Sequence, residues 1–187
     1  MEDYFIPGLE VLQNDAAILE GLLKKTSPPV YRHMQKYQVD PLLYMTDWFM
    51  CAMTRTLPWD TLLRVWDCFL AEGIRVIFKV GLVILGGTLN RHKVRKQCSG
   101  LCETLEVLRS PAEEILEEEF IINNMQRLNL RVEDFQIEHT RQKSRRAKQR
   151  AMQEAAANNT GSLTANRNGN GPSGSSSSHN GTPRTTL

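Results

Sequence analysis

Proline marks the start of one helix after another in this sequence, and that pattern restricts the fold more than any other feature. Ser27-Pro28, Asp40-Pro41 and Ser110-Pro111 each place proline directly after a residue that caps helix N-termini. Proline is tolerated at the first helical position because its missing N–H would have no intrahelical partner there. Leu57-Pro58 adds a start without a capping residue, and Glu113 completes a capping box with Ser110. The sequence therefore predicts a series of short helices.

Helical periodicity between these starts defines the expected segments. They are residues 15–25, 29–37, 41–55, 59–72, 75–89, 91–108 and 111–127. Gly73 stands where a left-handed residue commonly ends a helix, and Gly86-Gly87 is expected to weaken or end the helix that contains it. The strand-like residues within 76–85 have no hairpin turn beside them and are more easily housed in a buried helix. The predicted fold class is all-α.

Composition divides the chain into three parts. The three tryptophans, four tyrosines and six phenylalanines all lie between Tyr4 and Phe135. We therefore expect a globular domain over 1–128, a basic polar helix over 129–157 that projects from it, and a tail rich in Asn, Gly, Ser and Thr over 158–187. The tail contains too few apolar residues to offset its chain entropy, so it is expected to be disordered.

The sequence carries none of the patterns of common enzyme sites. Its four histidines are far apart, its four cysteines form no CxxC pair, and no phosphate-binding glycine loop or nucleophile elbow occurs. Five glutamates between 113 and 119 are better explained as a solvated helix face than as an acid/base pair. We expect no catalytic residue, no metal and no cofactor, and cysteines that remain reduced.

The most hydrophobic stretch, residues 74–89, is interrupted by Arg75 and Lys79. Its apolar run is shorter than the roughly 18 residues that a membrane-spanning helix needs. The first residues carry no basic region leading into an apolar one, so no signal peptide is expected. We expect a cytoplasmic protein without a transmembrane segment, held at membranes through its partners.

A basic run near residue 145 is hidden by the small formal net charge of +2. Its members are Arg141, Lys143, Arg145, Arg146, Lys148 and Arg150. Such a run can bind anionic lipid, nucleic acid or an import receptor through charge. A plain solvated helix is favoured, because no aromatic residue is interleaved for base stacking and no apolar face is available for a bilayer. A nucleic-acid or lipid binder driven by this run is the least favoured of the functions that we consider.

Two stretches carry a resemblance to a known family. The first runs from Tyr4-Phe5 through Leu22-Leu23 to Tyr31-Arg-His-Met34. The second is DPLLYMTDWFMCAMTRTLPWDTLLRVWD, residues 40–67, followed by Glu72-Gly73 and an apolar helix. A Trp-Phe pair, an R-x-LP turn and an RxWD box form a compound signature that chance rarely produces. Residues 1–128 resemble the C-terminal half of a TBC domain, the helical module that activates GTP hydrolysis by Rab GTPases.

The resemblance implies a mechanism whose reacting residues do not occur in this sequence. The family inserts an arginine from an I-x-x-D-x-x-R motif and a glutamine from a Y-x-Q motif into the GTPase. Neither motif is present, so the chain alone is expected to be inactive while the parent domain is a Rab GTPase activator in vesicle trafficking. Half a domain is also expected to expose the apolar surface that the other half would cover.

Arg64 and Asp67 of the RxWD box are the candidate partner-binding residues. A structural role is favoured for both, with Trp66 anchoring the helix and the two charged side chains contacting neighbouring chain. Direct contact with a Rab protein is the alternative.

The final residues fit a ligand pattern for PDZ domains, Ser/Thr-x-hydrophobic-carboxylate. Thr185 and Leu187 occupy its two defining positions. In this mode the tail adds a strand to a sheet edge and backbone amides hold the terminal carboxylate. The subgroup of TBC proteins that the sequence most resembles includes members ending in such a ligand. A non-catalytic helical adaptor that reaches a PDZ scaffold through this tail is therefore the alternative function.

Overall fold

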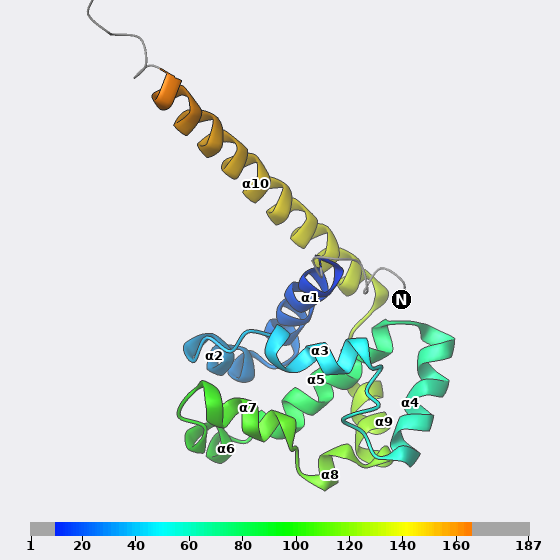
Figure 1. Cartoon of the computed structure of the whole chain (residues 1–187). Coiled ribbons are helices and arrows are strands. Elements are labelled where there is room, and N and C mark those ends of the chain that lie inside the picture. Colours follow the sequence, from blue (N-terminus) through cyan, green and yellow to red (C-terminus); the bar gives the residue numbers. More distant parts are fainter. Residues whose placement is uncertain (1–9, 166–187) are drawn as a thin grey trace, which may run out of the picture. The chain divides into compact units, whose positions relative to one another are not determined.

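The computed structural model describes residues 10–165, and it describes side chains for residues 10–153. Every regular element in the described range is a helix, which confirms the all-α class. The helices are α1 (Glu10–Thr26), α2 (Pro28–Lys36), α3 (Leu42–Met50), α4 (Trp59–Glu72), α5 (Arg75–Leu89), α6 (His92–Gln97), α7 (Leu101–Arg109), α8 (Glu113–Leu116), α9 (Glu118–Arg127) and α10 (Val132–Ala165) (Figure 1). Contacts divide the chain into two compact units, Met1–Ser144 and Arg145–Leu187.

The first unit is organised around α5. Eleven of its fifteen residues are buried, and they lie on every side of the helix. Helices α1, α3, α4, α7 and α9 all contact it (Figure 1). A helix that is apolar all round is stable in water where neighbours surround it, so α5 forms the centre of the core.

Helix α3 ends at Met50, although the sequence predicted a helix through residue 55. Ala52 and Met53 adopt left-handed φ angles of 44° and 67°, and the N–H of Met53 donates to the carbonyl of Trp48 at 3.0 Å. This turn places the Met53 side chain in the core with 0% exposure. Burying a methionine gains about 1.5–3 kcal/mol, which is comparable with the cost of the two left-handed residues at about 1–2 kcal/mol each. No glycine occupies the left-handed positions of this turn, so the residue types there could not predict it.

Two of the predicted helices are each broken into two. The predicted 91–108 segment becomes α6 and α7, separated by the buried Cys98 and an extended Gly100. The predicted 111–127 segment becomes α8 and α9, because Glu117 is extended at ψ 146°. A backbone carbonyl released at the second break, that of Leu116, accepts a buried hydrogen bond from Thr61 Oγ1 of α4 at 2.8 Å. At the second break, a tertiary contact thus replaces a helical bond that the break removes.

The helix starts predicted from proline have different outcomes. Helix α2 begins at Pro28, and Asp40 Oδ1 accepts the N–H of Leu42 at 2.9 Å where α3 begins. Helix α4 begins directly after Pro58. The capping box at Ser110 is wrong: Ser110 closes α7 by donating its N–H to Glu106, and no side chain caps α8. Pro111 and Ala112 separate Ser110 from the first residue of α8.

Gly86-Gly87 neither ends nor interrupts α5, contrary to one of the two predicted outcomes. A Cβ on Gly87 would lie 2.9 Å from Ile115 Cγ2 and 3.1 Å from the Phe120 ring. The glycine is therefore needed for close approach of α8 and α9 to the central helix, rather than as a helix stop.

Helix α10 begins in the first unit and is partly buried there. Glu138 and Gln142 are 7% and 6% exposed. Gln142 Nε2 donates to Glu138 Oε1 at 2.7 Å and to the carbonyl of Ala17 in α1 at 3.3 Å. The absence of a side chain at Gly21 makes room for the carboxylate, since a Cβ there would lie 2.2 Å from Glu138 Cδ. The compact unit accordingly runs to Ser144, whereas the predicted domain stops at 128.

An ion pair adds to this attachment. Lys25 Nζ lies 2.5 Å from Asp134 Oδ1. The hydrogen bond from Lys25, followed by one from the backbone of Arg131, lowers the pKa of Asp134. The first turns of α10 are thus tied to α1 by polar contacts, where the sequence predicted a solvated helix throughout.

The far end of α10 lies beyond its predicted limit. The helix continues to Ala165, past the expected boundary at 157. Composition argues against a packed core in 158–165, yet it does not prevent local helix, because each residue added to an existing helix gains a hydrogen bond and no proline intervenes. The remainder of the predicted disordered tail, residues 166–187, lies outside the described residues. Within the described range, no helix has the length and hydrophobicity to cross a membrane.

Candidate functional site

The turn between α3 and α4 is held by an indole hydrogen bond. Trp66 Nε1 donates to the carbonyl of Ala52 at 2.9 Å. The left-handed turn at Ala52 and Met53 thus serves both the core, through the methionine, and α4, through this carbonyl. The R-x-LP turn and the RxWD box, which are separate motifs in the sequence, form one structural unit.

Arg64 and Asp67 lie on the outside of this unit. Arg64 Nη1 is 3.8 Å from Asp67 Oδ2, and Arg64 Nε is 3.8 Å from Glu118 Oε1 at the start of α9. More than half of each of these three side chains is exposed. Exposed ion pairs of this length contribute about 0–1 kcal/mol, so they hold the charges in place only weakly. The geometry leaves both charges accessible to a partner.

Large apolar side chains share this outward side of α4. Trp59, Leu63 and Leu70 are 66%, 43% and 83% exposed. At 100° per residue they lie within one narrow stripe of the helix, bordered by Asp67. We call this stripe the α4 outer face.

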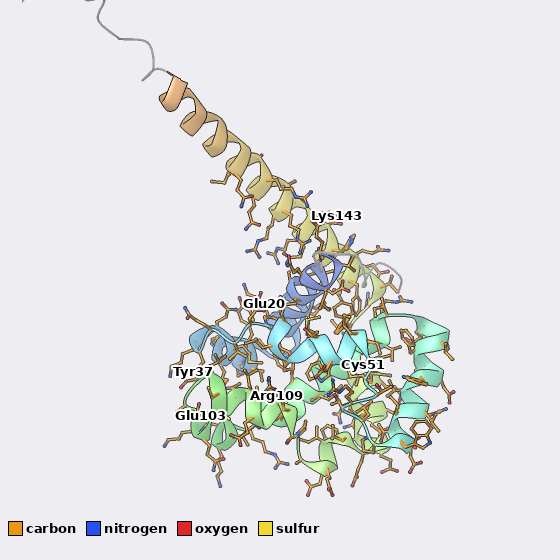
Figure 2. All side chains as sticks on the ribbon, in the orientation of Figure 1. Glu20, Tyr37, Cys51, Glu103, Arg109 and Lys143 are labelled. Atoms are coloured by element: carbon orange, nitrogen blue, oxygen red, sulfur yellow. The ribbon has the colours of Figure 1, made fainter. Side chains whose placement is uncertain are left out.

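The predicted basic run lies on α10 and is spread around the helix. Arg141 and Lys143 belong to the first unit, and Arg141 Nη1 lies 3.5 Å from Glu138 Oε2. Lys143 projects from α10 (Figure 2). Arg145, Arg146, Lys148 and Arg150 belong to the second unit. Helical spacing puts Arg141, Arg145 and Lys148 on one side and Lys143, Arg146 and Arg150 on the other, so the run forms no single basic face.

A second group of basic residues was missed by the sequence reasoning. Helix α2 carries Arg32 and Lys36, and the segment around α6 carries Arg91, Lys93, Arg95 and Lys96. Neither α2 nor residues 91–97 contains an acid. We call this group the α2–α6 basic surface. The signal available was the run RHKVRK itself, which the longer run on α10 overshadowed.

A buried histidine links the helices beneath that surface. His33 of α2 is 7% exposed, and its Nε2 lies 3.0 Å from Thr104 Oγ1 of α7. Burial lowers the pKa of His33, and the positive charges of Arg95 and Lys36 lower it further. Two helices distant in sequence therefore direct positive charge to one place.

Acidic side chains gather instead around α8 and α9. Glu113, Glu114, Glu117, Glu118 and Glu119 are all exposed. Among the residues that the structure describes, no group of three or more His, Cys, Asp or Glu side chains is arranged to hold a metal ion. The four cysteines are free thiols.

Hollows beside α1 lie away from the RxWD box. An apolar cavity of about 530 Å³ between α1, α5 and the start of α10 is lined chiefly by Ile18, Ile74, Phe78 and Phe135. A cleft of about 550 Å³ between α1, α2 and the start of α3 is lined by a mixture of polar and apolar side chains. Neither includes Arg64 or Asp67. Thr185 and Leu187, the predicted PDZ ligand, lie outside the described residues.

Comparison with known proteins bears on the same turn and helices. Residues 1–93, which end within α6, match the family model of the Rab-GTPase-TBC domain. TBC1 domain family member whacked of Drosophila melanogaster is 81% identical over 161 residues, which cover 86% of this chain and 44% of that protein. Residues 1–93 are therefore a segment of a Rab-GTPase-TBC domain, and the chain is similar to TBC1 domain family members.

Mammalian relatives share the TBC segment at lower identity. TBC1 domain family member 10A of Mus musculus is 47% identical over 135 residues, which cover 72% of this chain and 27% of that protein. Carabin of Mus musculus is 42% identical over 127 residues, which cover 68% of this chain and 29% of that protein. The chain thus spans less than half the length of these TBC relatives. The resemblance drawn from residues 40–67 is confirmed, and those residues form the turn and the helix that carry Arg64 and Asp67.

Proposed function

We propose that this chain is part of a protein that accelerates GTP hydrolysis by Rab-family GTPases in vesicle trafficking. The match of residues 1–93 to the Rab-GTPase-TBC domain carries the proposal. The buried α5 core and the tied turn between α3 and α4 supply a rigid base, and the exposed Arg64 and Asp67 supply charges that a GTPase can contact.

We further propose that the chain alone does not activate a Rab protein. The sequence contains neither the arginine motif nor the glutamine motif of the family. An arginine finger supplied in trans raises GTPase rates by about 10³–10⁵, or roughly 4–7 kcal/mol of barrier. The purified chain should therefore leave GTP hydrolysis by a panel of Rab proteins unchanged. An arginine finger would give far more than tenfold. Stimulation above about tenfold by the chain alone would therefore refute its proposed inactivity, and the proposal that it is part of a Rab GTPase activator would stand.

The role of Arg64 can be tested in a longer protein that contains this chain together with both motifs. Arg64→Glu reverses a charge on the accessible side of α4, and we expect a rise of about tenfold in KM for the Rab substrate with little change in kcat, as for loss of uniform binding. Arg127→Glu, an equally exposed change on α9, is the matched control. Equal KM values for the two variants would remove Arg64 from the partner-binding surface.

A second function rests on the C-terminal residues. We propose that Thr185 and Leu187 bind a PDZ domain, which would make the chain a helical adaptor even without GTPase activation. A peptide of the last ten or so residues should bind at least one domain of a PDZ array, and removing Leu187 should abolish that signal because the carboxylate is displaced. No hit with the intact peptide would dispose of the adaptor function.

We also propose a cytoplasmic location, with recruitment to membranes through Rab and PDZ partners. Fluorescence imaging of the tagged chain, before and after depletion of Rab-bearing membranes by fractionation, tests this placement.

A further inference from the structure

The α2–α6 basic surface is strongly charged and largely exposed. Arg32, Lys36, Arg91, Lys93 and Lys96 are exposed, and Arg95 is half-buried. Six Lys or Arg residues thus stand in two short segments, 28–36 and 91–97, that contain no acid. The proposed Rab contact at Arg64 makes no use of them.

The surface is held rigidly. Arg95 Nη1 donates to the carbonyls of Leu89 at 2.7 Å and Asn90 at 2.5 Å, which fixes α6 to the end of the central helix α5. The contact between His33 and Thr104 joins α2 to α7, the helix that follows α6. Tyr37 and Glu103 mark the ends of α2 and α7 that lie close together in Figure 2. Charges fixed on packed helices need little reorganisation when they meet a partner.

Neighbouring acids do not neutralise the surface. Helix α7 contributes Glu103 and Glu106 together with Arg109, a net charge of −1. Glu103 lies against the backbone at Gly100, where its Oε2 would be 2.6 Å from an added Cβ. Glu20 of α1 accepts a hydrogen bond from Gln35 Nε2 of α2. Six positive charges against this small acidic contribution leave a basic region.

The side chains next to these charges suit a lipid surface better than a nucleic acid. Leu101, the first residue of α7, is an exposed apolar side chain. Tyr37 is amphipathic and half-buried, but its ring is occupied: Lys36 Nζ lies 4.9 Å from the ring centroid, and the His33 ring makes an edge contact at 4.9 Å. A ring engaged in this way is a poor platform for base stacking. An exposed leucine five residues after Lys96 is compatible with the headgroup region of a bilayer.

We propose that the α2–α6 basic surface docks directly on an anionic membrane. Lys36, Lys93, Lys96, Arg32 and Arg91 contact lipid phosphates and carboxylates, and Leu101 enters the headgroup layer. The docking is independent of GTPase activation and of the PDZ ligand. It adds a direct lipid contact to the recruitment through partners described above.

Vesicle co-sedimentation of the full chain tests this surface. Phosphatidylcholine vesicles with phosphatidylserine should bind the chain, pure phosphatidylcholine vesicles should not, and added salt should release it. Removing two basic residues near an anionic surface is expected to weaken binding by about tenfold or more. Lys93→Gln/Lys96→Gln is the test variant, since both side chains are exposed. Lys143→Gln/Lys148→Gln in α10 is the control, because it removes two exposed positive charges that lie outside the α2–α6 basic surface.

The outcomes separate cleanly. A loss of fivefold or more in the test variant, exceeding that of the control variant, supports the proposal. A loss of vesicle binding smaller than fivefold in the test variant overturns the proposal. A loss no larger than in the control variant also overturns it and assigns the binding to α10. Competition by single-stranded oligonucleotide that is as effective as anionic vesicles would also overturn it, in favour of nucleic acid. Equal thermal denaturation curves of the two variants, followed by circular dichroism, would show that loss of folding is not the cause of weaker vesicle binding.

Discussion

Helices α5 and α10 relate to the rest of the protein in opposite ways. Buried side chains of α5 are apolar except for Thr88 and lie on every side of the helix. In α10, the buried side chains within the described range are polar, namely Glu138 and Gln142, and both face α1. Removal of apolar area from water holds α5 on every side. The start of α10 is held by a few directed polar contacts and by Phe135, whose ring lies 5.7 Å from that of Phe78 in α5. The comparison teaches that the length of a helix says little about how strongly it is bound.

The two modes of attachment also respond differently to change. Apolar packing loses energy in proportion to the volume removed, whereas a polar contact depends on the partner that is left behind. The predictions below use paired variants to test that distinction.

The largest effect is expected for truncation inside α5. Ile84→Ala removes a side chain that is 0% exposed and should lower the free energy of unfolding by about 3 kcal/mol. Ile137→Ala in α10, where the side chain is 64% exposed, should change it by less than about 0.5 kcal/mol. Urea denaturation followed by circular dichroism measures both. Similar changes in the free energy of unfolding for the two variants would show that the two helices do not differ in this way.

The next effect concerns the two adjacent glycines of α5. Gly87→Val should cost about 2 kcal/mol, because its Cβ meets Ile115 and Phe120 at 2.9–3.1 Å. Gly86→Ala should instead stabilise the protein by about 0.5–1 kcal/mol, since the nearest atom is 3.6 Å away and alanine favours helix. Thermal denaturation under matched conditions compares the pair. Destabilisation by both variants would mean that α5 tolerates no added side chain at either position.

A smaller effect tests the polar attachment of α10. Gly21→Ala should destabilise the protein by about 1 kcal/mol, because the new Cβ displaces the Glu138 carboxylate from Gln142. In a Glu138→Ala background the same substitution should become stabilising by a few tenths of a kcal/mol or more, through helix propensity. A double-mutant cycle measures the coupling. An unchanged sign in the two backgrounds would show that Gly21 does not act through Glu138.

The smallest effect concerns His33, a buried polar side chain outside α10. The pKa of His33 is lowered from 6.5, first by burial and then by Arg95 and Lys36, so the unfolded chain binds a proton more readily than the folded protein. The contribution of neutral His33 to stability is complete above pH 6.5 and is lost as the pH falls through the lowered folded pKa. His33→Gln should reduce the decline in the free energy of unfolding below pH 6.5. NMR titration of His33 supplies the direct check, and a pKa at or above 6.5 contradicts the assignment.

Sequence reasoning succeeded where local rules and burial agree. The starts of α2 and α4 follow from proline, and α5 follows from an apolar run with no hairpin beside it. The family followed from residues 40–67, where packing demands several residue types together. These features depend on a few neighbouring residues, so they can be read from one sequence.

The remaining features depend on contacts between distant residues. The left-handed turn at Ala52 and Met53 exists because the core accepts the methionine, and the break at Glu117 is supported by Thr61 of α4. The α2–α6 basic surface needs Arg95 and Lys36 to meet around His33. No local rule predicts such meetings. The partner role of Arg64 and Asp67 stays a prediction, since exposure alone does not identify what they bind.

The three tryptophans differ in exposure, so their fluorescence reports on three different environments in the protein. Trp48 is 2% exposed, Trp66 is half-buried with its indole N–H bonded to Ala52, and Trp59 is 66% exposed. Emission from Trp59 should be red-shifted and quenched by iodide, while emission from Trp48 should be blue-shifted and shielded. A partner seated on the α4 outer face would therefore report its arrival through fluorescence, with no label attached.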